Sequence, residues 1–150
     1  MGSSSEGLNV AKLIQAQLSN DFEPAIWNQG TVFMNDKSHL ENLESAVSVY
    51  DFIIFVFTPD DKIEIRGESK KMARDNVIFE LGMFIGKLKR MKAFLVFPTD
   101  TNLKILSDFD GIEKATIDDT KSDLNAALGD ACYKIKESIR IISNTYKVKP

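Results

Sequence analysis

The sequence contains very little cysteine and histidine, with Cys132 and His39 as the single examples among 150 residues. One thiol cannot form a disulfide within a chain, which fits a reducing compartment and predicts a cytoplasmic protein. One histidine and one cysteine are also too few for a zinc site built from these ligands. The neighbouring acids Asp60 and Asp61 follow a proline and are typical of a turn, so we expect no metal site.

Long apolar runs and an excess of positive charge are missing too. No apolar stretch reaches the roughly 18 residues that a membrane span requires, and the polar N-terminus is unlike a signal peptide. Lys and Arg number 19 against 22 Asp and Glu, which gives a net charge of -3 and argues against binding the nucleic-acid backbone. We therefore expect neither a membrane nor a nucleic-acid partner. The apolar fraction of 43% is that of a globular domain.

What the sequence does contain is an alternation of helix-like and strand-like apolar segments. Two short unbroken apolar runs, FIIFVF and AFLVF, are typical of central strands that are buried on both faces. Alternation of such strands with amphipathic helices predicts an α/β fold with a parallel sheet. We expect helices at residues 8–18, 40–49, 76–88 and 122–146, strands at residues 22–27, 52–57, 93–97 and 112–117, and a surface loop at residues 62–74.

The two ends of the chain depart from this alternation. The polar stretch GSSSEG follows Met1 directly and precedes the first helix, so the first strand of the sheet is largely missing. Pro24 lacks an N–H, which is typical of the start of a strand or of an edge strand and so is compatible with a strand at residues 22–27. The helical pattern is lost near the C-terminus. We therefore expect a domain over residues 1–145 and a linker or C-terminal tail over residues 146–150.

The glycine- and serine-rich turn Gly2-Ser3-Ser4-Ser5 is the first candidate for chemistry. Ser3 and Glu6 have the spacing of a capping box, which is the structural interpretation. The functional interpretation is a cradle for a phosphate or a ribose, because a helix N-terminus supplies free N–H donors. In open α/β sheets, ligands bind at the carboxyl ends of the strands, where this turn is expected. Both interpretations stay open on the residues alone.

Glu80 is the second candidate, because it is a single acid in a strongly apolar helix. No cation lies three or four positions away from it along the helix. Burying an unpaired carboxylate costs free energy and commonly shifts its pKa, which marks Glu80 as a candidate active-site residue. The alternative is that Glu80 lies on the one solvated strip of the helix. Gly82 would keep the neighbouring surface open for a ligand.

Trp27 and Asn28 form the third candidate, at the point where a strand-like segment gives way to a polar loop. The indole either covers the core or offers a stacking platform for a planar base, with the amide of Asn28 as a hydrogen-bonding neighbour. His39 stands next to Ser38 before a helix. No nucleophile motif accompanies it, so we assign it no role.

Four segments together resemble a known family: GSSSEGLNVA, AIWNQG, FIIFVFTPDD and, most specifically, ARDNVIFELGMFIGKLKR. They look like the bacterial TIR-like domain of the predicted nucleotide-binding type, which occurs in TIR-STING fusions and related anti-phage effectors. The resemblance implies a flavodoxin-like TIR fold, with a five-stranded parallel sheet of order 2-1-3-4-5 and helices on both faces. It also implies NAD+ glycohydrolase activity, with NAD+ as substrate, no cofactor, and the glutamate of the FELG block, Glu80, as the catalytic residue.

The resemblance also bears on partners. It implies self-association into oligomers or filaments, and a C-terminal STING-like sensor of cyclic dinucleotides that is not in this chain. A non-catalytic TIR assembly module and an enzyme like a nucleoside deoxyribosyltransferase, which also uses a glutamate in a similar fold, are the alternatives. The residues expected to bind substrate are Gly2, Ser3, Ser4, Ser5, Trp27, Asn28, Thr58, Arg74 and Asn76.

The chemistry of NAD+ cleavage suits an isolated carboxylate. Nicotinamide is cationic in NAD+ and leaves as a neutral base, so its departure needs no general acid. The transition state resembles an oxocarbenium ion, as in glycoside cleavage. An ionised carboxylate beside the ribose hydroxyls can orient the sugar and stabilise this positive charge. The expected products are nicotinamide and ADP-ribose or its cyclic form.

Overall fold

The computed structural model describes residues 1–27, 29, 34, 36–58, 61–65, 68–72, 75–99 and 111–147. Its centre is a four-stranded sheet in the order β1-β2-β5-β6, in which every neighbouring pair is parallel. Ile53 pairs with Ala93 across the two central strands. The strands are β1 (Gly2–Ser3), β2 (Ile53–Val56), β5 (Ala93–Pro98) and β6 (Glu113–Ile117).

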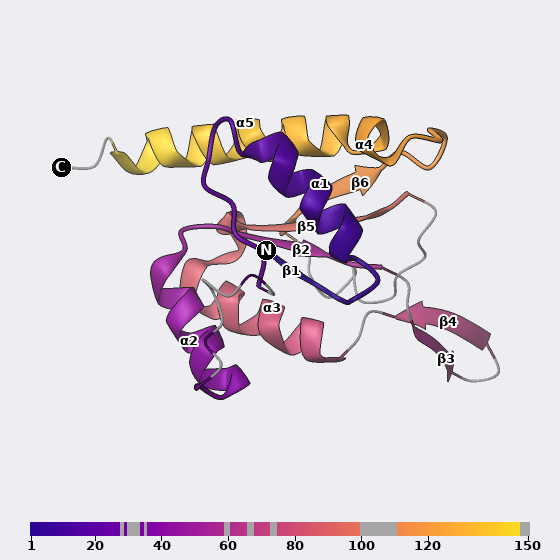
Figure 1. Ribbon diagram of the computed structural model, residues 1–150, viewed down its shortest axis with the longest axis horizontal. Helices are drawn as coiled ribbons and strands as arrows, with labels where there is room; N and C mark the ends of the chain where they lie inside the picture. Colours follow the sequence, from indigo (N-terminus) through magenta and orange to yellow (C-terminus); the bar gives the residue numbers. More distant parts are fainter. Residues whose placement is uncertain are drawn as a thin grey trace.

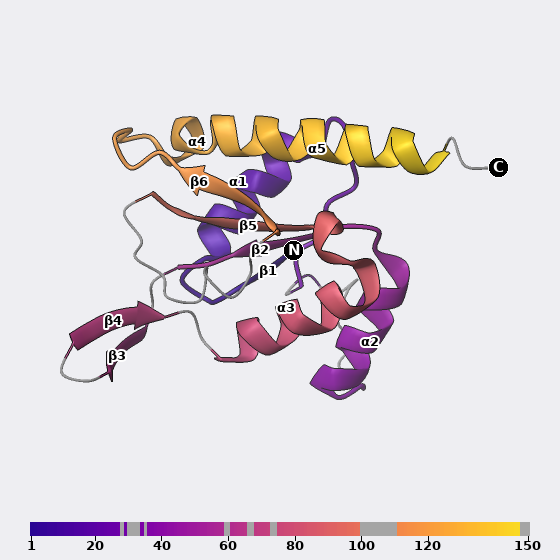
Figure 2. The ribbon, with the colours of Figure 1, turned by 180° about the vertical axis from the view of Figure 1, so that it is seen from behind.

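Helices cover both faces of this sheet (Figure 1; Figure 2). On one face lie α1 (Leu8–Leu18), α4 (Leu124–Ala127) and α5 (Gly129–Lys147), and on the other lie α2 (His39–Val49) and α3 (Asp75–Leu88). A 3-10 turn (Arg90–Lys92) leads into β5. The side chains of β2 alternate between the two layers, so that Ile54 packs towards α1 and α5, and Phe55 packs towards α2 and α3.

The apolar runs of the two central strands explain this layering. All four residues of β2 are buried, and so are the first five residues of β5. Each buried Ile, Leu or Phe side chain stabilises the fold by about 1.5–3 kcal/mol relative to exposure. A strand that is apolar on both faces therefore gains most from helices on each side. The prediction of an α/β fold with a parallel sheet is confirmed.

Most of the predicted helices are confirmed. The helix at residues 8–18 has the expected bounds, and α2 and α3 each begin one residue earlier than expected. The predicted long helix at residues 122–146 begins instead at Leu124, because the Asp123 side chain caps α4 by accepting hydrogen bonds from two backbone N–H groups. The helical run is then interrupted at Leu128, before α5 begins at Gly129.

The expectation of a surface loop at residues 62–74 is wrong. Two antiparallel strands, β3 (Asp61–Ile65) and β4 (Glu68–Met72), lie there and project from the body of the domain (Figure 1). Ile63 and Ile65 alternate with charged residues, and this period of two is the strand signal that the high charge content concealed.

The prediction of five strands is not confirmed, since the described residues form four strands in the main sheet. The segment at residues 22–27, expected to be a strand, is assigned no strand. It nevertheless runs beside β1: Trp27 donates a backbone hydrogen bond to the Met1 carbonyl, and the Met1 amino group donates to the Ala25 carbonyl. With only two residues in β1 and no N–H on Pro24, these contacts do not extend into a ladder.

Candidate active site

Glu80 lies on the buried face of α3. Its side chain is 4% exposed, and the neighbouring residues Val77 and Leu81 belong to the core between α2, α3 and the sheet. The exposed positions of the same helix include Phe79 and Gly82. The alternative that Glu80 occupies a solvated strip is therefore wrong. A Cβ added to Gly82 would meet nothing within 4 Å, but Gly82 lies two positions after Glu80 and on the exposed face of α3, so it does not border the buried carboxylate.

The Glu80 carboxylate has a partner from another helix. Nε2 of His39 lies 2.8 Å from Oε1 of Glu80, and the two residues are 41 positions apart in the sequence. Burial raises the pKa of Glu80, while the hydrogen bond and the charge of His39 act in the opposite direction. The helix neighbours of Glu80 do not reveal this partner, because α2 brings it to Glu80 only in the folded chain.

A capping box places His39 at the first position of α2. Ser38 Oγ accepts from the Glu41 backbone N–H at 3.2 Å, and the Glu41 carboxylate accepts from the Ser38 backbone N–H at 2.8 Å. This reciprocal pair satisfies N–H groups that a helix end otherwise leaves without partners. The apolar face of α2, which includes Leu43 and Val47, packs in the same core as α3. The start of α2 is therefore held against α3.

The serine turn follows the carboxyl end of β1 and contacts Thr58, which lies just after the carboxyl end of the adjacent strand β2. Ser4 is buried, its Oγ lies 2.8 Å from Oγ1 of Thr58, and it accepts from the Gly7 backbone N–H at 3.2 Å. The capping box expected between Ser3 and Glu6 is not formed, because Ser3 still belongs to β1 and the N-cap of α1 is Gly7, with no side-chain cap. The structure thus places hydroxyls at the edge where parallel sheets bind ligands.

Gly2 and Trp27 belong to the core. A Cβ on Gly2 would lie 2.8 Å from a ring carbon of Phe55 and 2.9 Å from one of Trp27, so only glycine permits this close approach. The Trp27 side chain stacks on Phe84 with ring centroids 5.5 Å apart, and the residue is 7% exposed. Of the two interpretations of Trp27, the structure shows the one in which the indole is part of the core.

The other predicted site residues are placed less fully. Ser5 is exposed in the turn between β1 and α1, and Asn76 is described only by its backbone, in the first turn of α3. Asn28 and Arg74 lie outside the described residues. The structure therefore forms two separate side-chain contacts, one between Ser4 and Thr58 and one between Glu80 and His39. The histidine is the site residue that the sequence alone did not indicate.

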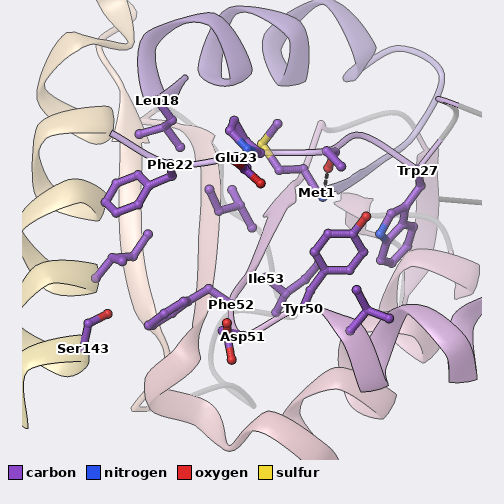
Figure 3. A pocket seen from close by; sticks show the side chains of 15 residues that line it. Met1, Leu18, Phe22, Glu23, Trp27, Tyr50, Asp51, Phe52, Ile53 and Ser143 are labelled. Atoms are coloured by element: carbon purple, nitrogen blue, oxygen red, sulfur yellow. Dashed lines mark hydrogen bonds between the residues drawn. The ribbon is translucent and has the colours of Figure 1, made fainter. Parts of the chain in front are cut away.

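A cavity of about 460 Å³ lies at the opposite, amino ends of the strands, beside Met1 (Figure 3). Its lining is mostly apolar and includes Leu18, Phe22, Tyr50 and Phe52. Ligands of open α/β sheets bind at the carboxyl ends of the strands, so we do not assign this cavity to the substrate.

Two further features are lacking in the described part of the chain. It holds no group of three or more His, Cys, Asp or Glu side chains that could bind a metal ion. Its helices include none that is both long enough and apolar enough to cross a membrane.

Comparison with known proteins gives a consistent family. The family described as "CAP12/Pycsar effector protein, TIR domain" matches residues 1–119. The "Pycsar effector protein PaPycTIR" of Pseudomonas aeruginosa is 38% identical over 134 residues, which are 87% of this chain and 43% of that protein. The "CD-NTase-associated protein 12" of a Lachnospiraceae bacterium is 40% identical over 112 residues, 75% of this chain and 34% of that protein.

A protein of the same name from Niabella drilacis is 41% identical over 125 residues, 80% of this chain and 39% of that protein. The chain thus spans less than half the length of these curated relatives. The family match includes the whole parallel sheet, from β1 to β6, and both His39 and Glu80. It confirms the resemblance that the four sequence segments carry. This chain therefore belongs to the TIR domain family of CAP12/Pycsar effector proteins.

Proposed function

We propose that this domain cleaves NAD+ at the bond between nicotinamide and ribose, as the effector of a bacterial anti-phage system. The observation that carries the proposal is the Glu80 carboxylate, which is buried in an apolar layer and hydrogen-bonded to His39. A buried carboxylate with a perturbed pKa is a common mark of an active site. Glu80 also stands in the first half of α3, which runs from the carboxyl ends of the parallel strands towards their amino ends.

In the proposed reaction, the bond between ribose C1′ and the nicotinamide nitrogen breaks. Nicotinamide leaves with the bonding electron pair as a neutral base, and positive charge develops on C1′ and the ring oxygen. Ionised Glu80 accepts a hydrogen bond from a ribose hydroxyl and stabilises this charge. Water then adds to C1′ and releases a proton, which gives ADP-ribose. Attack by a ring nitrogen of the adenine instead of water gives the cyclic product.

We place the ribose and phosphate groups of NAD+ at the carboxyl ends of β1 and β2. The hydroxyls of Ser4 and Thr58 lie there, within hydrogen-bonding distance of each other, and the more exposed Ser3 and Ser5 are adjacent in the turn. Asn28, Arg74 and Asn76 remain contacts proposed from the sequence. Trp27 and Gly2 shape this region from within the core rather than by touching the substrate.

We also propose that the domain acts in a signalling system based on a cyclic nucleotide. The support is the names of the relatives, which are Pycsar effectors and CD-NTase-associated proteins. A cyclic-dinucleotide sensor and self-association into oligomers or filaments are the partners that the resemblance implies. If self-association completes the site, the specific activity rises with protein concentration.

The test is nicotinamide release from NAD+ by the wild-type chain and by Glu80→Gln, measured over a wide range of protein concentration. Loss of one preorganised electrostatic group at a reacting centre costs about 10²- to 10³-fold in rate, and we expect a loss of this order. Glu44→Gln is the matched control, because Glu44 is exposed on α2. Unchanged turnover by a folded Glu80→Gln variant contradicts the assignment.

The same assay, together with incubation with free nucleosides and acceptor bases, separates the alternatives. A non-catalytic assembly module self-associates but releases no nicotinamide at any concentration. An enzyme like a nucleoside deoxyribosyltransferase transfers the sugar of a free nucleoside to an added acceptor base and leaves NAD+ intact. Specific activity that does not change on dilution argues against a site shared between copies.

A further inference from the structure

We propose that His39 is the positioning residue of the site: its imidazole Nε2–H holds Oε1 of Glu80, which leaves Oε2 to meet the ribose. This inference rests on the proposed function of Glu80 and adds a second side chain to its machinery. His39 acts through Glu80 and needs no contact with the substrate. The contact between His39 on α2 and Glu80 on α3 supports this role by its geometry.

The contact joins a buried atom to a half-exposed ring. The Glu80 side chain is 4% exposed and the His39 side chain is 57% exposed, with 2.8 Å between Oε1 and Nε2. The imidazole thus lies at the boundary between the core and the solvent and approaches the carboxylate from α2. A single fixed hydrogen bond to one oxygen sets the direction of the other, and such orientation is what a catalytic carboxylate needs.

His39 is the titratable group that faces Glu80 among the described side chains around it. The strands β1, β2 and β5 carry no titratable side chains. On α2, the Glu41 carboxylate is engaged by Ser38, and Glu44 is exposed. On α3, the exposed Lys87 lies seven positions after Glu80, near the end of the helix.

This arrangement also decides when Glu80 is ionised. The proposed reaction requires the charged carboxylate, which burial disfavours, so that burial raises the pKa of Glu80. A donated Nε2–H stabilises the carboxylate whether the ring is neutral or protonated, because the hydrogen bond exists in both states. Removal of the imidazole leaves burial without this opposing effect. The pKa of Glu80 then rises further, and a higher pH is needed to ionise it.

The first test is the pH dependence of nicotinamide release by His39→Ala, His39→Gln and the control Glu44→Ala. We expect His39→Ala to lose about 10- to 100-fold in kcat, because a misplaced catalytic group can cost about 100-fold in rate. The acidic limb of the pH–rate profile of this variant moves to higher pH. The Gln amide can place an N–H near the position of Nε2, so His39→Gln recovers part of the rate. Glu44→Ala behaves as wild type.

Two outcomes of that assay overturn the inference. One is a His39→Ala variant with unchanged kcat and an unchanged pH profile. The other is a variant that is more active at every pH, which would show that the imidazole obstructs the site. A loss in which only KM changes and the acidic limb stays in place also contradicts positioning, because the orientation of Glu80 acts on the chemical step.

The second test needs no activity. His39 is the single histidine of the chain, so its ring gives one set of imidazole signals in the NMR spectrum of untagged, ¹⁵N-labelled protein. At pH 8 we expect the tautomer with the proton on Nε2. Glu80→Ala shifts these signals and weakens the tautomer preference, whereas Glu44→Ala leaves them in place. Signals that do not respond to Glu80→Ala overturn the contact. A confirmed contact in a chain that leaves NAD+ intact refutes the proposed function alone.

Discussion

Glu80 occupies a position where an apolar side chain would stabilise the fold more. Its neighbours Val77 and Leu81 are buried in the layer between α2, α3 and the sheet, and the carboxylate interrupts this apolar face. Burial raises the pKa of Glu80, and His39 opposes that rise. Active sites commonly retain such locally unfavourable groups, at a cost in stability.

This unfavourable burial predicts that Glu80→Gln stabilises the protein at neutral and alkaline pH. The folded-state pKa of Glu80 is raised above its ordinary value of 4.5, so its contribution to stability is present below that pH and is lost as the pH rises. The neutral Gln amide has nearly the same shape as the Glu side chain and does not ionise, so it avoids the cost of a buried charge. We expect the free energy of unfolding to be about 1 kcal/mol higher than that of the parent at pH 8, within the range of single stabilising substitutions.

Urea unfolding at pH 4, 6 and 8 measures this difference, which should shrink towards pH 4. The exposed Glu44→Gln serves as the control and should change little at any of these values. A Glu80→Gln variant that is less stable than the parent at pH 8 would show that the contact between His39 and ionised Glu80 more than compensates for burial.

At the scale of elements, the start of α2 determines where His39 lies. The helix is amphipathic, but its apolar face alone does not set which residue begins the first turn. The capping box of Ser38 and Glu41 does so, and it lowers the pKa of Glu41 through the hydrogen bonds from Ser38. Loss of the Ser38 cap would therefore alter the backbone at His39, the next residue, and so displace the imidazole from Glu80.

We expect Ser38→Ala to lower the free energy of unfolding by about 1 kcal/mol, the usual cost of losing an N-cap. It should also reduce nicotinamide release, because the first turn of α2 no longer holds the imidazole against Glu80. Ser45→Ala is the matched control: Ser45 Oγ donates to the Glu41 carbonyl within the same helix and is exposed. Urea unfolding and the NAD+ assay measure both effects. Equal behaviour of the two variants would contradict the role of the cap.

At the scale of the whole molecule, the layer of α1 and α5 is joined by ion pairs at its surface. Asp21, just after α1, lies 2.8 Å from Nζ of Lys136 and 2.7 Å from a guanidinium nitrogen of Arg140 on α5. Hydrogen bonds and charge from these two residues lower the pKa of Asp21 below its ordinary value of 3.8. Such a group stabilises the fold above that pH, and the contribution is lost as the pH falls through the lowered value.

Asp21→Asn should therefore lower the midpoint of thermal unfolding at pH 7 in dilute salt. The effect should be small, because exposed ion pairs contribute little and salt screens them, and it should diminish in concentrated salt and at acidic pH. Asp51→Asn is the control, since the exposed Asp51 takes part in no ion pair within the described part of the chain. Melting curves in which the loss from Asp21→Asn is independent of salt and pH would exclude an electrostatic origin.

The elements of the fold could largely be predicted, because their signals are local. The helical spacing at residues 8–18 and the unbroken apolar runs of β2 and β5 reflect which faces of a segment must be buried. The hairpin of β3 and β4 was missed because charge dominated its composition, and the strand expected at residues 22–27 forms too few backbone hydrogen bonds with the short β1. In both segments, the formation of a strand depends on backbone hydrogen bonds with a neighbouring segment, which composition does not record.

That Glu80 is an acid in an apolar helix can be read from the sequence, because it depends on neighbours within one or two turns. What surrounds the carboxylate depends on how the helices and strands pack. The contact between His39 and Glu80 joins residues 41 positions apart, and the contact between Ser4 and Thr58 joins residues 54 positions apart. The burial of Trp27 against Phe84 is of the same kind. Such contacts depend on how helices and strands pack together, and no periodicity within a single segment records that packing.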